Sequence, residues 1–307
     1  METYSLHSCD VCFVILHYLT LEDTKKCIDS IIEKIDIEEY RIVVVDNAST
    51  NDSGILLKHM YSNNSNVEVL IQNENLGFAK GNNIGFYYAK QVYNSKFIVL
   101  LNNDTYLLQN NFYKTICDEY TETDFAVLGP RVYTPDGSVV NPARTQLMTL
   151  IELQEWEKYL KRHLFFNKIY LETLFVYGSK TIRTFIRIIL NKGLIEKKET
   201  TNILERQENV QLHGCCLVFS EKYHGKFDGL EDRTFLYGEE DILFARLLLN
   251  GLKSVYSPCL KIFHSEDAST NALFLKKRLK RRFLYETKLE SLKIMKEYIG
   301  EVNRDSK

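Results

Sequence analysis

The sequence reads FIVLLNNDT at residues 97–105, where an apolar run passes directly into polar side chains. Five apolar residues in a row are typical of a strand that is buried on both faces of a sheet. Asn102, Asn103 and Asp104 end this run, and ligands of open α/β sheets bind beyond the carboxyl ends of the strands. We therefore expect these side chains to face a crevice. A carboxylate there can bind a divalent cation, and the cation can in turn bind a diphosphate. A simple polar turn after a strand would give the same pattern.

Apolar runs and helical segments alternate on the amino-terminal side of this strand. The expected strands lie at residues 11–16, 41–45 and 67–71. Residues 21–35 repeat isoleucines at helical spacing, and a second helix is expected from the glycine-containing segment 75–85 to about residue 93. This alternation indicates parallel strands joined by right-handed crossovers. Residues 1–105 thus look like a nucleotide-binding α/β unit, although they contain neither GxxxxGK[ST] nor GxGxxG.

The second half of the chain alternates less regularly. Expected helices lie at residues 111–120, 242–250 and 272–299, and expected strands at 126–132, 210–220, 254–256 and 261–263. The segment from about 148 to 206 interrupts this pattern, because it is long, basic and rich in aromatic residues. The whole chain is therefore expected to be an α/β protein with a basic helical insertion and a helical carboxyl-terminal tail.

Charge and composition point to a cytoplasmic protein with an anionic partner. No stretch approaches the roughly 20 apolar residues that cross a bilayer, and residues 1–10 do not resemble a signal peptide. The seven cysteines, including the Cys9–Cys12 pair, are interpreted as packing residues. Residues 158–198 carry an excess of eight positive charges, and residues 276–282 add six more. Basic segments on an acidic body indicate an anionic surface as partner, and we expect no nucleic acid.

An apolar stripe within the insertion leaves two interpretations open. The stripe consists of Ile182, Phe185, Ile186 and Ile189, flanked by Arg183 and Arg187. It could lie on an anionic membrane with its arginines at the level of the headgroups. It could equally pack on the protein and leave a solvated basic edge.

Acidic residues gather where strands end or helices begin. Asp46 and Asp104 follow expected strands, Glu239, Glu240 and Asp241 open an expected helix, and His264 ends a late strand. Asp104 and His264 would suit Mn²⁺ or Mg²⁺. Three acids at a helix start are partly explained by the helix dipole, but a carboxylate in a half-buried cleft can also act as a general base.

Taken together and in this order, the motifs resemble those of the family 2 glycosyltransferases. They are VVDNAS at 44–49, NLGFAKGNN at 75–83, LNND at 101–104, GPR at 129–131, FLYGEED at 235–241 and the late His264. The resemblance covers residues 11–270 apart from the basic insertion. More narrowly, the chain resembles the bacterial rhamnosyltransferase and galactofuranosyltransferase-like branch that builds cell-surface polysaccharides.

This resemblance implies a GT-A fold, with a mixed, Rossmann-like sheet and helices on both faces. The implied glycosyltransferase domain spans 1–270, divided into a nucleotide-binding half (1–105) and an acceptor half (106–270) that includes the insertion (148–206), and 271–307 form a helical tail. The implied reaction is an inverting transfer dependent on Mn²⁺ or Mg²⁺. The donor would be dTDP-rhamnose or a UDP-hexose, and the acceptor a hydroxyl of a lipid-linked or cell-surface glycan. The enzyme would work in the cytoplasm, as a peripheral protein on the inner face of the plasma membrane.

Site residues follow from the same resemblance. The substrate-binding positions are Asp46, Asn47, Asn75, Gly77, Phe78, Gly81, Asn82, Asn102, Asn103 and Arg131. Asp46 would read the nucleoside, while Asp104 and His264 would hold the metal, because Asn102 replaces the first acid of the DxD motif. Glu240 would be the general base, with Glu239 and Asp241 as neighbouring candidates. His213 could contact the acceptor or be a core histidine, and Arg131 could face the cleft or cap a strand.

Two other functions fit parts of the same pattern. A catalytically idle module of the same fold could bind a nucleotide sugar or act as a scaffold; Asn102 favours it, whereas the acidic cluster and His264 favour an enzyme. A nucleotidyltransferase that makes nucleotide sugars would need a glycine- and lysine-rich phosphate loop near the amino terminus, and the sequence has none there.

Overall fold

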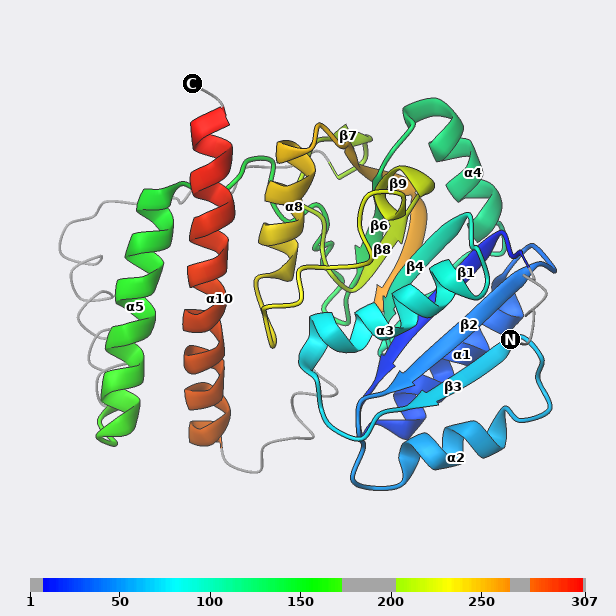
Figure 1. Ribbon diagram of the computed structural model, residues 1–307, viewed down its shortest axis with the longest axis horizontal. Helices are drawn as coiled ribbons and strands as arrows, with labels where there is room; N and C mark the ends of the chain where they lie inside the picture. The colour runs from blue at the N-terminus through cyan, green and yellow to red at the C-terminus, as the bar shows by residue number, and fades with distance from the viewer. Residues whose placement is uncertain (1–7, 173–202, 266–276, 306–307) are drawn as a thin grey trace.

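The computed structural model describes residues 8–172, 203–265 and 277–305 (Figure 1). Its strands are β1 (Val11–His17), β2 (Tyr40–Asp46), β3 (Val67–Ile71), β4 (Phe97–Asn102), β5 (Thr105–Leu107), β6 (Val127–Tyr133), β7 (Gln207–Glu208), β8 (Cys216–Phe219) and β9 (Ser254–His264). Its helices are α1 (Leu21–Lys34), α2 (Ser53–Met60), α3 (Gly77–Gln91), α4 (Phe112–Thr123), α5 (Leu150–Lys168), α7 (Glu221–His224), α8 (Glu239–Leu249) and α10 (Lys277–Asp305).

The strands of the described residues form one mixed sheet in the order β3-β2-β1-β4-β8-β6-β9-β5, with β7 paired to β9. The four amino-terminal strands run parallel, as the alternating pattern predicts. β8 is antiparallel to β4 and β6, and β9 is parallel to β6 but antiparallel to β5. The sequence-based prediction of a mixed α/β sheet is therefore confirmed.

Side chains of β1 alternate between two apolar layers, as a strand buried on both faces requires. Phe13 and Ile15 pack with α1, α2 and α4 on one face of the sheet. Cys12 and Val14 point to the other face, where α3 and α8 pack. Figure 1 shows α3 in front of the sheet and α1 behind it. The predicted helices on both faces are present.

A third apolar cluster joins α5, α8 and α10 beside the sheet. Figure 1 shows α5 and α10 side by side at one end of the molecule. α5 begins with a capping box, in which the side chains of Thr149 and Glu152 each accept a backbone N–H of the other residue. The long tail helix is thus part of the packed structure, whereas the proposed division into domains at residue 270 stays a prediction.

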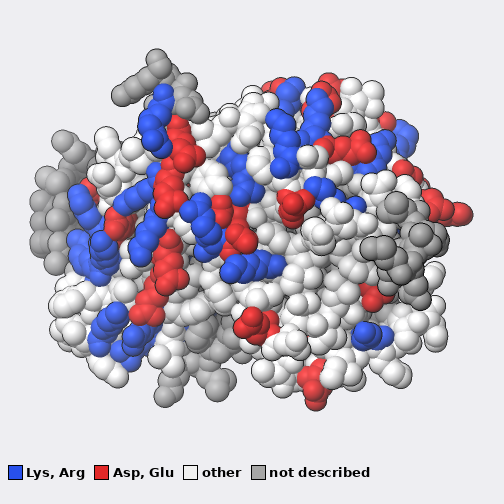
Figure 2. Space-filling model, viewed as in Figure 1, with Lys and Arg blue, Asp and Glu red and all other residues white. Residues whose placement is uncertain are grey.

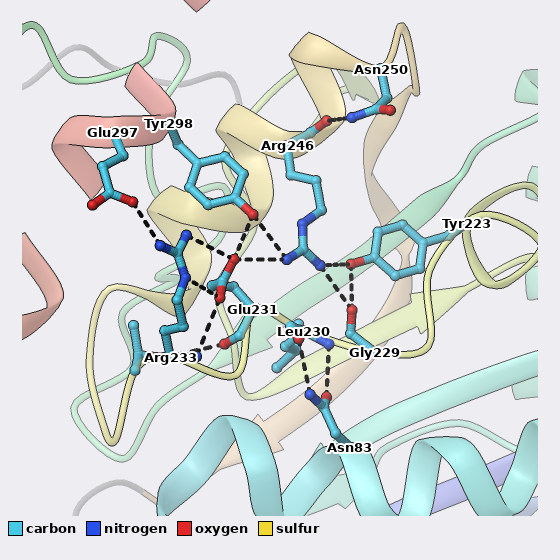
Figure 3. Close-up of polar contacts among 11 residues, drawn as sticks. Asn83, Tyr223, Gly229, Leu230, Glu231, Arg233, Arg246, Asn250, Glu297 and Tyr298 are labelled. Atoms are coloured by element: carbon cyan, nitrogen blue, oxygen red, sulfur yellow. Dashed lines mark hydrogen bonds and ion pairs between the residues drawn. The ribbon is translucent and has the colours of Figure 1, made fainter. Parts of the chain in front are cut away.

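A polar network fastens α10 to α8 (Figure 3). Arg246 of α8 donates to the carbonyl of Gly229 at 3.0 Å, to Oη of Tyr223 and of Tyr298 at 3.2 Å, and to Oε2 of Glu231 at 3.3 Å. Tyr298 of α10 also donates to Glu231 at 2.5 Å. Burial alone would raise the pKa of Glu231, but hydrogen bonds from Arg233 and Tyr298 lower it to about 2. The carboxylate is therefore ionised at neutral pH and ties the two helices together.

The basic segments carry many acidic partners in the described part of the chain. Figure 2 shows Lys and Arg interspersed with Asp and Glu over α5 and α10. The ion pairs include Lys158–Glu155 at 2.9 Å, Lys161–Glu157 at 2.6 Å, Arg281–Glu172 at 2.9 Å and Arg282–Glu286 at 3.1 Å. The predicted stripe at Ile182, Arg183, Phe185, Ile186, Arg187 and Ile189 lies outside the described residues. Among the helices that are described, none is both long and apolar enough to cross a membrane.

Several elements differ from the sequence-based expectation at their ends. α3 begins at Gly77, inside the glycine-containing segment, and α8 begins at Glu239, so that three acids occupy its first turn. The two short strands expected at 254–256 and 261–263 belong to one strand, β9, which pairs with β6 in two stretches separated by an irregularity at residues 258–260. Of the expected strand 210–220, only Cys216–Phe219 pairs as β8. Strand ends depend on distant partners, which local sequence does not specify.

Candidate functional site

A cleft of about 570 Å³ opens beyond the carboxyl ends of β1, β2 and β4. Its lining residues are Leu16, Tyr18, Asn47, Asn75, Gly77, Phe78, Asn102, Asn103, Asp104, His213, Gly214, Cys215, Phe235, Leu236, Tyr237, Glu239, Glu240, His264 and Phe283. The crevice expected after residue 101 is therefore present, and Asn102, Asn103 and Asp104 all reach it. The cleft also brings together the strand ends, the start of α8 and the tail helix.

Asp104 and His264 meet because β5 and β9 are paired. Thr105 lies opposite His264 in that ladder, so the residue before β5 is carried next to the end of β9. Nε2 of His264 lies 3.2 Å from Oδ1 of Asp104, and both side chains are buried. The backbone N–H of Ser265 donates to the carbonyl of Asp104 at 3.0 Å and holds the two segments together.

The chemistry of this pair fits a divalent cation. A carboxylate oxygen and an imidazole nitrogen are ligands for Mn²⁺, and to a lesser degree for Mg²⁺. Nδ1 of His264 is buried and has no hydrogen-bond partner among the described residues, although buried polar atoms are normally satisfied. Asn103, in contrast, turns its amide into the protein and donates to Oγ1 of Thr20 at 2.7 Å and of Thr24 at 2.9 Å.

The first turn of α8 presents its three acids in three different environments. Burial, followed by the charge of Glu240, raises the pKa of Glu239 to about 8, and Oγ1 of Thr234 donates to this side chain at 3.1 Å. Burial and the same neighbour raise the pKa of Asp241 to about 6, and Asp241 is not among the residues that line the cleft. Glu240 lines the cleft and lies against Gly214, where an added Cβ would be 2.5 Å from Oε1 of Glu240.

The turn before α8 requires unusual backbone angles. Tyr237 and Gly238 both have positive φ, at 72° and 92°. A side chain at Gly238 would also lie within 3.1 Å of Sδ of Met295 in α10. This turn aims Glu240 into the cleft, and Tyr237 there carries the ammonium of Lys288 over its ring, 4.9 Å from the centroid. Burial lowers the pKa of Lys288, and the nearby Glu240 carboxylate opposes that shift.

Asn47 organises the side of the cleft formed by α3. Its Nδ2 donates to Oδ1 of Asn75 at 3.0 Å and to the carbonyl of Gly77 at 3.1 Å, while its Oδ1 accepts the N–H of Leu76 at 2.9 Å. Gly77 has φ of +81°, and the next N–H, from Phe78, donates to the carbonyl of Phe235 at 2.7 Å. The start of α3 is thus joined to the segment that precedes the acids of α8.

Four other predicted site residues, Asp46, Gly81, Asn82 and Arg131, do not line the cleft. Asp46 is 3% exposed and accepts the N–H of Ser49 at 3.2 Å. Asn82 donates to the carbonyl of Phe78 at 3.0 Å, and Gly81 packs against Leu16. Arg131 stacks on Tyr133 at 5.1 Å, and its buried Nε has no partner among the described residues. The functional roles assigned to these residues and to Asp241 stay predictions.

Several lining residues were not predicted from the sequence. They are Leu16, Tyr18, Gly214, Cys215, Phe235, Leu236, Tyr237 and Phe283. Phe235, Leu236 and Tyr237 could have been predicted as lining residues, because this apolar run directly precedes the acids at the start of α8. Phe283 gave no signal, because α10 reaches the cleft only through its packing with α5 and α8. His213, for which two interpretations were open, lines the cleft, and its ring lies 5.6 Å from that of His264.

Comparison with known proteins supplies a family and a fold. A family model described as "Glycosyl transferase family 2" matches residues 12–190. The low-salt glycan biosynthesis hexosyltransferase Agl10 of Haloferax volcanii is 24% identical over 141 residues, which are 46% of this chain and 42% of Agl10. The chain thus spans less than half the length of this curated relative.

Two solved structures share the fold at low identity. TarS of S. aureus, residues 1–349, has a TM-score of 0.53 at 13% identity, over 95% of this chain and 70% of that one. GalNAc-T7 with UDP, GalNAc and Mn²⁺ has a TM-score of 0.53 at 12% identity, over 85% of this chain and 44% of that one. These similarities confirm the predicted fold class, a mixed α/β fold of the GT-A type.

Proposed function

Because this chain belongs to glycosyl transferase family 2, we propose that it transfers a sugar from a nucleoside diphosphate sugar to a hydroxyl group of a glycan. The observation that carries this proposal is the placement of Asp104, His264 and Glu240 on one cleft. A metal-binding pair and a candidate base around a shared space are what such a transfer requires.

Glu240 is the proposed general base. A general base must be ionised, and the pKa of about 8 keeps Glu239 protonated at neutral pH. Asp241 does not line the cleft. Glu240 would accept the proton of the acceptor hydroxyl as that oxygen attacks the anomeric carbon from the side opposite the leaving diphosphate. A single displacement of this kind inverts the anomeric configuration.

Asp104 and His264 are the proposed ligands of Mn²⁺ or Mg²⁺. When bound, such a cation neutralises the charge that develops on the departing diphosphate. Asn102, the residue in the first position of the DxD motif, lines the cleft without offering a carboxylate. Asn47, Asn75, Gly77 and Phe78 are proposed to hold the nucleoside, since they line the cleft beyond β2. Asp46 would act through Asn47, its direct neighbour in the chain.

The proposed donor is dTDP-rhamnose or a UDP-hexose, in line with the rhamnosyltransferase and galactofuranosyltransferase-like branch. A thermal-shift screen with UDP-, dTDP- and GDP-sugars in the presence of Mn²⁺ tests this assignment. We expect stabilisation by a pyrimidine nucleotide sugar and little effect from GDP-sugars. The absence of stabilisation by every nucleotide sugar would contradict the proposal.

A lipid-linked or cell-surface glycan at the inner face of the plasma membrane is the proposed acceptor. The charge excess of residues 158–198 and 276–282 supports peripheral contact with anionic lipid. Ile151 and Phe165 of α5 are 73% and 59% exposed and could add apolar contact. Co-sedimentation with anionic liposomes at low salt tests this part. Equal recovery with neutral and anionic liposomes would refute it.

A catalytically idle nucleotide-sugar-binding module is the second candidate, favoured by Asn102 at the first DxD position. Slow, metal-dependent hydrolysis of a bound nucleotide sugar separates the two, because only an enzyme activates the anomeric carbon. We expect hydrolysis that is lost when the metal is chelated. Tight donor binding without any hydrolysis or transfer would favour the idle module.

A further inference from the structure

Two residues beside the Asp104–His264 pair have no part in the proposed transfer. His213 and Cys215 both line the cleft, and Cys215 is 1% exposed. One potential ligand atom of His213, one of Cys215 and one of His264 all lie within 4.8 Å of one another. Among the described residues, no other group of three or more histidine, cysteine or acidic side chains brings its ligand atoms this close together.

These distances are close to those of an occupied metal site. Ligand atoms of a tetrahedral zinc site lie about 2.0–2.3 Å from the ion and therefore about 3.3–3.8 Å from one another. The ligand atoms of His213, Cys215 and His264 are at most 4.8 Å apart. Side-chain rotations that move them by about 1 Å would bring them into that range. Nδ1 of His264 is buried and has no hydrogen-bond partner among the described residues, so this nitrogen can serve as a ligand without losing a bond within the protein.

The backbone around these residues is held in place on both sides. The N–H of His213 donates to Oδ1 of Asn141 at 3.0 Å, and the N–H of Asn102 donates to the carbonyl of Cys215 at 2.8 Å. The N–H of Cys215 donates to Nδ1 of His213 at 3.2 Å. This last bond is long, and a cation bound at that nitrogen would replace it. The segment therefore presents an imidazole and a thiol to the same side as His264.

We propose that His213, Cys215 and His264 form a site of nitrogen and sulfur ligands that binds Zn²⁺ or Co²⁺ more tightly than Mn²⁺ or Mg²⁺. Thiolate and imidazole ligands favour these softer cations, whereas Mg²⁺ prefers oxygen ligands. Zn²⁺ in this site would compete with the cation expected next to the donor diphosphate. The inference rests on the proposed function for this location, but its test measures metal binding alone.

The test uses the full chain, freed of metal and titrated with Co²⁺. We expect a thiolate-to-cobalt charge-transfer band in the near ultraviolet, which only a sulfur ligand can produce. Cys215→Ala should abolish this band, whereas Cys259→Ala, which removes an exposed thiol elsewhere, should retain it. Cys216→Ala serves as the matched control for loss of a buried thiol in the next position. Cys215→Ser provides a second variant with nearly the same volume.

Zinc affinity gives the second measurement, by competition with a chromophoric chelator. We expect His213→Ala and Cys215→Ala each to weaken Zn²⁺ binding by at least about 10-fold, with a much smaller change for Mn²⁺. A wild-type cobalt complex without the thiolate band would overturn the inference, and so would a Zn²⁺ affinity unchanged in folded Cys215→Ala and Cys215→Ser. Neither result would affect the proposed sugar transfer, which is tested separately by donor binding with Mn²⁺.

Discussion

The carboxylate of Glu240 lies against the Cα atom of Gly214, so closely that an added Cβ would be 2.5 Å from Oε1. Glu240 belongs to the first turn of α8, and Gly214 lies just before β8. The absence of a side chain at residue 214 thus leaves the space in which the proposed base sits. This contact links the acid to the floor of the cleft, where His213 and Cys215 also lie.

Gly214→Ala should therefore displace the carboxylate of Glu240 without removing it. We expect the rate of sugar transfer to fall at least about 10-fold, because small misplacements of a catalytic group are costly, while donor affinity stays near wild type. Steady-state kinetics and calorimetric donor titration measure the two effects. Gly300→Ala in α10, where an added Cβ meets no atom within 4 Å, is the matched control. Unchanged kinetics in folded Gly214→Ala would show that the contact does not position the base.

Asp104→Asn should weaken metal-dependent donor binding, because it removes the carboxylate proposed to hold the cation. We expect donor affinity with Mn²⁺ to fall at least about 10-fold, toward the value measured without metal. Asp118→Asn, which alters an exposed acid paired with Lys114, is the control. Equal donor affinities for Asp104→Asn and wild type, with and without Mn²⁺, would refute the assigned role.

Glu239 should make the protein less stable as the pH rises. Its pKa is raised from 4.5 to about 8 in the folded state, so the native protein binds this proton more tightly than the unfolded chain does. The contribution of this group to the free energy of unfolding therefore falls between pH 4.5 and 8. Glu239→Gln removes the effect, and its stability relative to wild type should increase over that range. Urea unfolding at several pH values measures this difference, and a difference independent of pH would contradict it.

Glu231 should behave in the opposite sense. Its folded-state pKa is lowered from 4.5 to about 2, so its stabilising effect is present above pH 4.5 and is lost as the pH falls through 2. Because Glu231 accepts charged hydrogen bonds from Arg233 and Arg246, Glu231→Gln should lower the free energy of unfolding by about 1–3 kcal/mol at neutral pH. The cost should shrink in acid. Glu297→Gln, in which the acid is 57% exposed, should cost much less.

The sequence predicted the parallel half of the sheet and one wall of the cleft, because both depend on local patterns. In residues 97–105, the apolar run predicted β4, and the polar residues at its end predicted that Asp104 faces the cleft. The closeness of Asp104 and His264 depends on pairing between β5 and β9, which the local sequence does not specify. Phe283 reaches the cleft through helix packing, which no local pattern encodes.

The three acids of α8 also show what local sequence patterns cannot predict. Sequence could place Glu239, Glu240 and Asp241 at a helix start, but it could not rank them. The ranking comes from the folded surroundings, since Glu239 is 6% exposed beside Thr234, Asp241 does not line the cleft and Glu240 lies over Gly214. Burial is a property of the complete fold and cannot be predicted from the neighbouring residues in the sequence.

Glu240→Gln tests the central claim most directly, because it keeps the size of the side chain and removes only its ability to accept a proton. Transfer to an acceptor glycan and binding of the nucleotide sugar with Mn²⁺ are measured on the same preparation. We predict that transfer falls at least about 100-fold while donor affinity stays within a few-fold of wild type. Transfer near the wild-type rate would contradict the account.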